Sequence, residues 1–280
     1  MTLTKRTIDV VRVQGARRAT AADCAAVEEP LEIRLHGRPF AVIMRTPGAD
    51  RELAAGFLFS ERVVTNPDGF GTIERCRDRA EDASRETPRE TLRENVVNVT
   101  LTDPTALDRA FAGQRQVMTG SSCGLCGRRS IESLAVDVAP LSASWKMHAV
   151  SFATLAGRLR EAQAVFDETG GLHAAGLFTP TGDLVDVAED VGRHNAVDKV
   201  VGRRLMQEMW PVSDLALFVS GRSSFEILQK ALLAGIPIVA AVSAPSTLAI
   251  DLAHEMGITL VGFVRGERFN IYTHSERITS

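Results

Sequence analysis

The sequence is short of aromatic residues and of net charge, and both shortages exclude classes of protein. Aromatic residues make up 5% of the 280 residues and include one tyrosine. A surface that stacks nucleic-acid bases on a row of aromatic side chains is therefore not expected. The formal net charge of −3 argues against nucleic-acid binding driven by overall charge. A local basic pocket is still compatible with this composition.

Long apolar runs are missing as well, because Pro, Ser or a charged residue interrupts each of the most apolar stretches. No segment is therefore expected to span a membrane. Residues 1–20 are basic but lack the continuous apolar run of a signal peptide. The four cysteines are unevenly spaced, which does not suggest a secreted disulfide scaffold. Together these observations predict a cytoplasmic protein with reduced thiols.

The chain is longer than a usual single domain, so we expect two, divided near residue 140. Residues 1–140 have the pattern of a smaller α+β domain. Its expected elements are a polar arm (1–25) with a short edge strand (9–13), a β-hairpin (31–35 and 40–44), a helix (50–62) capped by Asp50 and a half-buried strand (97–101). Residues 74–94 hold six arginines and seven acidic residues, which predicts a solvated or partly disordered insertion, with a partner-docking segment as the alternative.

Residues 141–280 change to an alternation of helices with short apolar strands. The expected helices cover 151–168, 193–209, 225–233 and 247–256, and the expected strands cover 172–178, 184–187, 215–219, 236–242, 258–264 and an extended piece at 269–273. Strands made almost only of Val, Ile, Leu and Ala between helices predict a largely parallel sheet covered on both faces. The domain is therefore expected to have three α/β/α layers.

Three strand-end loops of this domain have the composition of an anion site. In an open α/β sheet, ligands collect beyond the carboxyl ends of the strands. The loops are Ser220–Ser224, Ser243–Ser246 and Arg265–Arg268, and Ser223 with Glu226 predicts a capping box. Small residues, free backbone N–H groups and arginines favour a phosphate-bearing ligand, with Gly221, Arg222 and Ser223 as candidate contacts. Ordinary helix caps are the alternative for each loop.

Two histidines are the other candidates for chemistry in this half of the chain. His194 lies within Asp190–Asn195, beside an expected helix start, and is a candidate general base or ligand-binding group. A cap or packing role is the commoner alternative. His173 lies in an expected strand of small residues, where a hydrogen-bonded core histidine is the favoured interpretation.

The most distinctive segment is 118–129, where Cys123 and Cys126 lie among glycines and small hydroxyl residues. Zinc binding needs about four ligands, and Cys24 and Cys76 do not form a second pair. A thioredoxin-like pair belongs at a strand-to-helix junction, which this segment does not resemble. A persulfide needs one exposed, activated thiol, and the two arginines that follow favour the thiolate. The segment suits a persulfide best, although spacing alone leaves the other chemistries open.

Five segments resemble the FdhD-type formate dehydrogenase accessory proteins, and the resemblance extends from about residue 32 to residue 272. The segments are Arg45–Gly48, Thr119–Gly127, Thr169–Ala175, Glu189–Lys199 and Ser220–Ser224. The resemblance implies a sulfurtransferase that takes sulfur from a cysteine desulfurase as a persulfide. It then delivers the sulfur to the molybdenum bis(molybdopterin guanine dinucleotide) cofactor before that cofactor enters formate dehydrogenase.

The resemblance also implies which residues act. Cys123 would carry the persulfide, Cys126 would assist, and the cofactor-binding segment falls on Phe263, Val264, Arg265, Gly266, Glu267 and Arg268. It further implies a cytidine-deaminase-like second domain, a homodimer and no permanently bound metal. One alternative is a non-catalytic chaperone that binds the cofactor and docks it onto the apoenzyme. The other is a zinc deaminase, although the order of its motifs is reversed here and His173-Ala174-Ala175 lacks the catalytic Glu.

Overall fold

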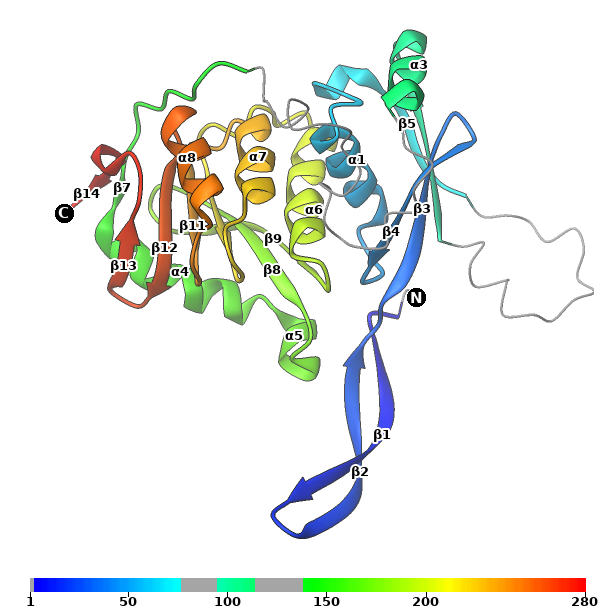
Figure 1. Ribbon diagram of the computed structural model, residues 1–280, viewed down its shortest axis with the longest axis vertical. Coiled ribbons are helices and arrows are strands. Elements are labelled where there is room, and N and C mark those ends of the chain that lie inside the picture. The colour runs from blue at the N-terminus through cyan, green and yellow to red at the C-terminus, as the bar shows by residue number, and fades with distance from the viewer. Residues whose placement is uncertain (1–2, 77–94, 114–137) are drawn as a thin grey trace, which may run out of the picture.

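A computed structural model describes residues 3–76, 95–113 and 138–280 (Figure 1). The elements before residue 114 are β1 (Lys5–Gln14), β2 (Arg17–Ala26), β3 (Glu29–Leu35), β4 (Arg38–Arg45), α1 (Asp50–Ser60), β5 (Phe70–Arg75), β6 (Val96–Leu101) and α3 (Pro104–Gly113), with a 3-10 turn at Pro67–Gly69. The predicted hairpin corresponds to β3 and β4, and the predicted half-buried strand to β6. Of the charged insertion, residues 77–94 lie outside the described residues.

After residue 137 the helices are α4 (Ala149–Glu161), α5 (Ala164–Thr169), α6 (Arg193–Met206), α7 (Phe225–Ala234) and α8 (Thr247–Glu255). The strands are β7 (Met147–His148), β8 (His173–Phe178), β9 (Leu184–Asp190), β10 (Ala216–Val219), β11 (Ile238–Ala241), β12 (Thr259–Arg265), β13 (Arg268–Ile271) and β14 (Ile278–Thr279), with a 3-10 turn at Ser275–Arg277. Among the described residues, no helix combines the length and apolar character needed to cross a bilayer.

The main sheet has six strands in the order β13-β12-β11-β10-β8-β9. Strands β10, β11 and β12 are parallel, as predicted, but β8 is antiparallel to both its neighbours and β13 is antiparallel to β12. The prediction of a largely parallel sheet is therefore wrong at both ends. The reason is the short connections 179–183 and 266–267, because only antiparallel strands can be joined by a tight turn.

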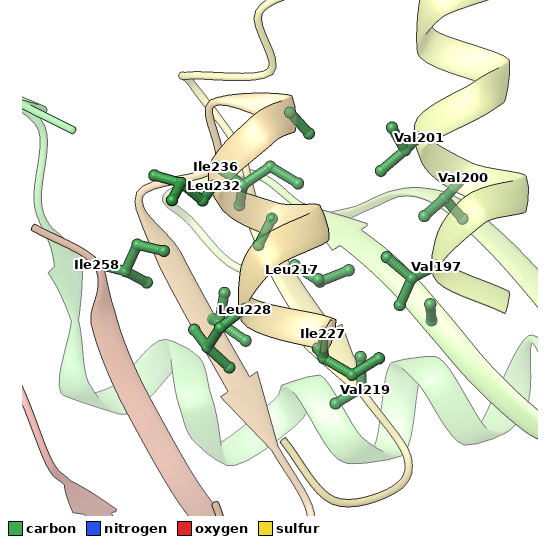
Figure 2. Close-up of a cluster of buried hydrophobic side chains, with 14 of the residues drawn as sticks. Val197, Val200, Val201, Leu217, Val219, Ile227, Leu228, Leu232, Ile236 and Ile258 are labelled. Atoms are coloured by element: carbon green, nitrogen blue, oxygen red, sulfur yellow. The ribbon is translucent and has the colours of Figure 1, made fainter. Parts of the chain in front are cut away.

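Helices cover both faces of this sheet (Figure 1). Alternate side chains of β10 divide between the two sides: Leu217 and Val219 pack with α6 and α7, whereas Ala216 and Phe218 pack with α4. Figure 2 shows the first of these clusters, in which valines of α6 and aliphatic side chains of α7 meet β10. Because both faces are buried, the strands lack the polar alternation of a half-exposed sheet. The likeness to cytidine deaminases stays a prediction.

A second sheet, in the order β4-β3-β6-β5, packs on α1 and encloses a core of its own. Helix α1 lies beside α6 (Figure 1), and glycines lie where the two helices meet. An ideal Cβ built at Gly56 would lie 2.0 Å from the backbone oxygen of Asp198, and one at Gly202 would lie 1.9 Å from that of Glu52. The two helices therefore touch backbone to backbone. The division of the chain near residue 140 stays a prediction.

Three local predictions are incomplete or wrong. The strand predicted at 9–13 lies within β1, but the polar arm is a longer two-stranded ribbon, β1 and β2, paired from Lys5↔Ala26 to Gln14↔Arg17 and extending away from the body (Figure 1). The long helix expected at 151–168 breaks between α4 and α5. Asp50 does not cap α1, because the N-cap is Ala49 and the Asp50 carboxylate accepts a hydrogen bond of 2.9 Å from the buried Arg45 guanidinium. A tertiary ion pair has replaced the local cap.

Candidate functional site

The carboxyl ends of β9, β10, β11 and β12 lie along one edge of the main sheet, which we call the rim. Strand β9 runs in the same direction as β10, because both are antiparallel to β8. Helices α6, α7 and α8 therefore begin at the same edge. The predicted grouping of the strand-end loops is confirmed, and the loop after β9 joins them.

Hydrogen bonds connect these loops into one continuous surface. The Ser220 backbone N–H donates to the Ala174 carbonyl at 2.9 Å, and the Ser246 N–H donates to the Ser223 carbonyl at 3.1 Å. At the far end the Phe263 N–H donates to the Ser243 carbonyl at 3.2 Å. The positions of backbone groups along the rim are thus fixed before any ligand arrives.

The predicted capping box at α7 is wrong. The N-cap is Ser224, and the Ser223 hydroxyl is fully buried without a hydrogen-bond partner among the described residues. Glu226 turns instead to His194, whose Nε2 lies 2.6 Å from Glu226 Oε2 and 3.2 Å from Ser224 Oγ. A hydrogen bond to a carboxylate requires a proton on Nε2, so Glu226 orients the imidazole and fixes its tautomer. His194 is therefore a buried imidazole whose orientation Glu226 fixes. Its role toward a ligand stays a prediction.

Much of the segment Asp190–Asn195 is structural. The buried Asp190 carboxylate lies 2.7 Å from the Lys199 ammonium and accepts hydrogen bonds from the Thr46 and Gly192 backbone N–H groups. The Asn195 side chain donates to the Met44 carbonyl at 2.8 Å. These contacts tie the end of β4 to the start of α6. The sequence predicted a functional site in this segment. No local pattern distinguishes such a site from the structural contacts found here, which we call the Asp190 clamp.

His173 lies at the start of β8 and is half-buried at the rim, so the predicted core position is wrong. Gly221 comes close to it: an ideal Cβ there would lie 3.4 Å from His173 Nδ1 and 3.8 Å from Arg193 Cδ. Burial lowers the pKa of His173 below 6.5, and the charges of Arg193 and His194 lower it further, while Asp190 opposes them. His173 therefore favours the neutral form at pH 7.

This lowered pKa predicts a pH-dependent stability. Below pH 6.5 an unfolded chain binds a proton at His173 that the folded chain excludes, so stability falls as pH decreases through that window. In urea unfolding between pH 8 and pH 5, His173→Gln is expected to lose less stability below pH 6.5 than the unchanged protein. Near pH 8 the difference in unfolding free energy between the two proteins should not change with pH. Parallel curves over the whole range would contradict the prediction.

The segment Phe263–Arg268 is not an open loop, because it covers the end of β12, a tight turn at 266–267 and the first residue of β13. Phe263 has a φ of 55° and is 39% exposed, at an irregularity where the register shifts between Gly262 and Arg265. Positive φ is rare for a bulky residue and marks a conformation imposed by its surroundings. Val264 is buried in the core on the α4 side, whereas Arg265, Gly266, Glu267 and Arg268 are exposed.

Arginines gather near the rim. Arg193 opens α6, and its buried Nε has no hydrogen-bond partner among the described residues. Arg222 is exposed at the loop before α7. Helix N-termini and guanidinium groups together are a favourable setting for phosphate oxygens.

Cys123 and Cys126 lie outside the described residues. Within the described ranges no group of three or more His, Cys, Asp or Glu could hold a metal ion.

Comparison with known proteins gives consistent matches over almost the whole chain. The model of the FdhD/NarQ family matches residues 26–279. A protein of Streptomyces avermitilis named sulfur carrier protein FdhD is 49% identical over an alignment of 276 residues, and the match covers 96% of this chain and 94% of that protein. One of the same name from Saccharolobus solfataricus is 43% identical over an alignment of 273 residues, and the match covers 96% of each chain.

A solved structure agrees with these matches. It is a crystal structure from Desulfotalea psychrophila, described there as a candidate formate dehydrogenase accessory protein. The two chains share 26% sequence identity and superpose with a TM-score of 0.76, covering 99% of this chain and 100% of that one.

Proposed function

The chain belongs to the FdhD/NarQ family, and from this membership and the rim together we propose that it is a sulfur carrier serving formate dehydrogenase. The relatives named sulfur carrier protein FdhD span nearly its full length. The observation that carries the proposal is the convergence of three helix N-termini and several arginines on one edge of the sheet. Such an edge suits a ligand with two pyrophosphate groups.

The proposed chemistry is sulfur transfer through Cys123. Its thiolate attacks the outer sulfur of a persulfide on a cysteine desulfurase, the S–S bond breaks, and the desulfurase cysteine leaves as a thiolate. A persulfide now stands on Cys123. Attack of Cys126 on the inner sulfur then forms a disulfide and releases hydrosulfide to the metal of the bound cofactor. The thiol pair supplies both electrons, so a later thiol reductant must reopen the disulfide.

The proposed substrate at the rim is the molybdenum bis(molybdopterin guanine dinucleotide) cofactor. Its phosphates would lie against Gly221 and Arg222, whereas the predicted contact Ser223 is fully buried behind them in the same loop. Phe263 offers an exposed aromatic ring, with Arg265 and Arg268 close by in sequence. The partners we propose are the desulfurase, the formate dehydrogenase catalytic subunit and a second copy of this chain. A cytoplasmic location follows from those partners.

The test is incubation of the protein with a cysteine desulfurase and cysteine, followed by mass spectrometry. The expected result is one added sulfur on Cys123, and none at that position in Cys123→Ala. The variant should still bind GDP but should fail to activate formate dehydrogenase. The same measurement separates the chaperone alternative, in which no persulfide forms and Cys123→Ala activates the enzyme normally. That outcome would overturn sulfur transfer and leave cofactor binding standing.

A further inference from the structure

The ribbon of β1 and β2 has no role in the proposed sulfur transfer. It forms a two-stranded sheet of its own and points away from the body past α5, on the same side of the molecule as the turn between β12 and β13, which lies at the rim (Figure 1). The family match begins at residue 26, so almost all of the ribbon precedes it. An isolated two-stranded ribbon is at best marginally stable in water, which suits a segment that a partner completes.

The base of the ribbon is attached beside the rim. Strand β8 begins at the rim because it is antiparallel to β10, and α5 comes shortly before it in the chain. Strand β2 packs against α5, and Lys5 of β1 pairs with Glu168 of that helix. An ideal Cβ built at Gly171 would lie 3.5 Å from the Cβ of Ala26. These contacts fix where the ribbon leaves the body, so a protein that covers the rim meets the ribbon as well.

The outer half of the ribbon combines apolar and basic side chains. Val11 and Val13 are 62% and 61% exposed. Arg18 is directly opposite Val13 and therefore shares one face of the ribbon with both valines. Arg17 and Arg18 are exposed and form no ion pair within the described ranges. These four residues, which we call the ribbon tip, have the composition of a surface that binds another protein.

The charge of the ribbon is opposite to that of the whole chain. Residues 5–26 hold five basic and two acidic side chains, a net charge of +3, whereas the whole chain carries −3. Such a concentration of positive charge favours a partner with an acidic surface. Both edges of the ribbon are also open, because no third strand of the described chain pairs with it. Unpaired edge groups can add to a strand of another protein.

We propose that the ribbon tip binds the protein that receives the cofactor, the catalytic subunit of formate dehydrogenase, at an acidic surface of that subunit. The inference rests on the proposed function, in which the cofactor is held at the rim. The acceptor must approach the rim to take the cofactor, and the ribbon projects on that side (Figure 1). A nucleic acid is disfavoured, because residues 5–26 contain no aromatic side chain on which bases could stack.

The experiment measures binding of the cofactor-free catalytic subunit of formate dehydrogenase from the same organism to the full-length protein, by biolayer interferometry at low and high salt. Arg18→Glu is expected to weaken binding about tenfold and to reduce its salt dependence, because the reversed charge faces acidic groups. Val13→Thr keeps the β-branched shape that the strand favours. It should weaken binding about tenfold with the salt dependence unchanged, because a hydroxyl replaces an apolar contact.

Two exposed positions outside the ribbon supply matched controls. Arg51→Glu makes the same change of charge on α1, and Val150→Thr makes the same change at a valine of α4 that is 64% exposed. Neither control should alter the affinity for formate dehydrogenase. A loss confined to the two ribbon variants would therefore reflect the position of the side chains and not the net charge or the loss of an exposed valine.

The ribbon variants should still form the Cys123 persulfide and bind GDP, so a failure of docking is distinguishable from a failure of sulfur transfer. Unchanged affinity of both ribbon variants for formate dehydrogenase overturns the proposal, and so does a lack of measurable binding by the unchanged protein. If that affinity is unchanged, slower persulfide formation in the variants assigns the ribbon to the desulfurase instead. A smaller sedimentation coefficient of the free variants would then assign it to a second copy of this chain.

Discussion

Replacing Gly56 by alanine is expected to lower the free energy of unfolding by about 3 kcal/mol, at the upper end of the usual cost of overpacking. The new Cβ would lie 2.0 Å from the Asp198 backbone oxygen and 2.6 Å from its carbonyl carbon. Both atoms belong to the α6 backbone, so relief requires α1 and α6 to separate. Close-packed interiors do not yield in this way without loss of neighbouring contacts. Urea unfolding followed by circular dichroism measures the effect.

Gly157 supplies the matched control, because it also lies within a helix but is exposed in α4 with no atom within 4 Å of an ideal Cβ. Gly157→Ala is expected to stabilise the protein by about 0.5–1 kcal/mol, since alanine has the higher helix propensity. Opposite signs for two identical substitutions would reflect the packing alone. If Gly56→Ala also stabilised the protein, the backbone contact between α1 and α6 would be wrong.

The second large effect is expected from Lys230→Met. The Lys230 ammonium lies 2.7 and 2.8 Å from the two carboxylate oxygens of Asp198, and the Ser60 hydroxyl donates to the same carboxylate at 2.8 Å. The Lys230 and Asp198 side chains are 10% and 3% exposed. Removing the cation leaves a buried carboxylate without its charge partner, which costs about 3–5 kcal/mol. The measurement is the unfolding free energy at pH 7.

A double mutant tests the cause. Asp198→Ala combined with Lys230→Met removes both charges and should recover part of the loss, giving a favourable coupling energy in the cycle. The exposed pair of Arg109 with Asp103, 2.9 Å apart, is the control, and Arg109→Met should leave stability nearly unchanged. Equal losses for Lys230→Met and Arg109→Met would show that burial adds nothing to the first pair.

The parts of the fold that follow from sequence are those with a strong local pattern. Strands β10, β11 and β12 and helices α7 and α8 lie where the apolar runs predict them, because a strand buried on both faces has no polar positions to obscure it. Of the ribbon, only a short part of β1 was predicted and β2 was missed, because most of their side chains are exposed and give no core-facing alternation. The break between α4 and α5 has no Pro or Gly to announce it.

The candidate site was predictable in location but not in detail. Topology alone places the strand-end loops at one edge. Charged residues are expected at the surface, so no pattern indicates that Lys230 and Asp198 meet in the interior. Glu226 has the spacing of a capping residue, yet it pairs with His194, which lies far away in sequence. The roles of Cys123 and Cys126 depend on the family resemblance and on chemistry.

The clamp formed by Asp190 has a consequence for how the molecule melts. It attaches the Thr46 backbone to the end of β9, directly before α6, a separation of 144 positions along the chain, while the glycine contacts lock α1 onto α6. Neither sheet can lose its structure without exposing unpaired polar groups of the other. Heating should therefore produce one cooperative transition, although the two sheets have separate hydrophobic cores.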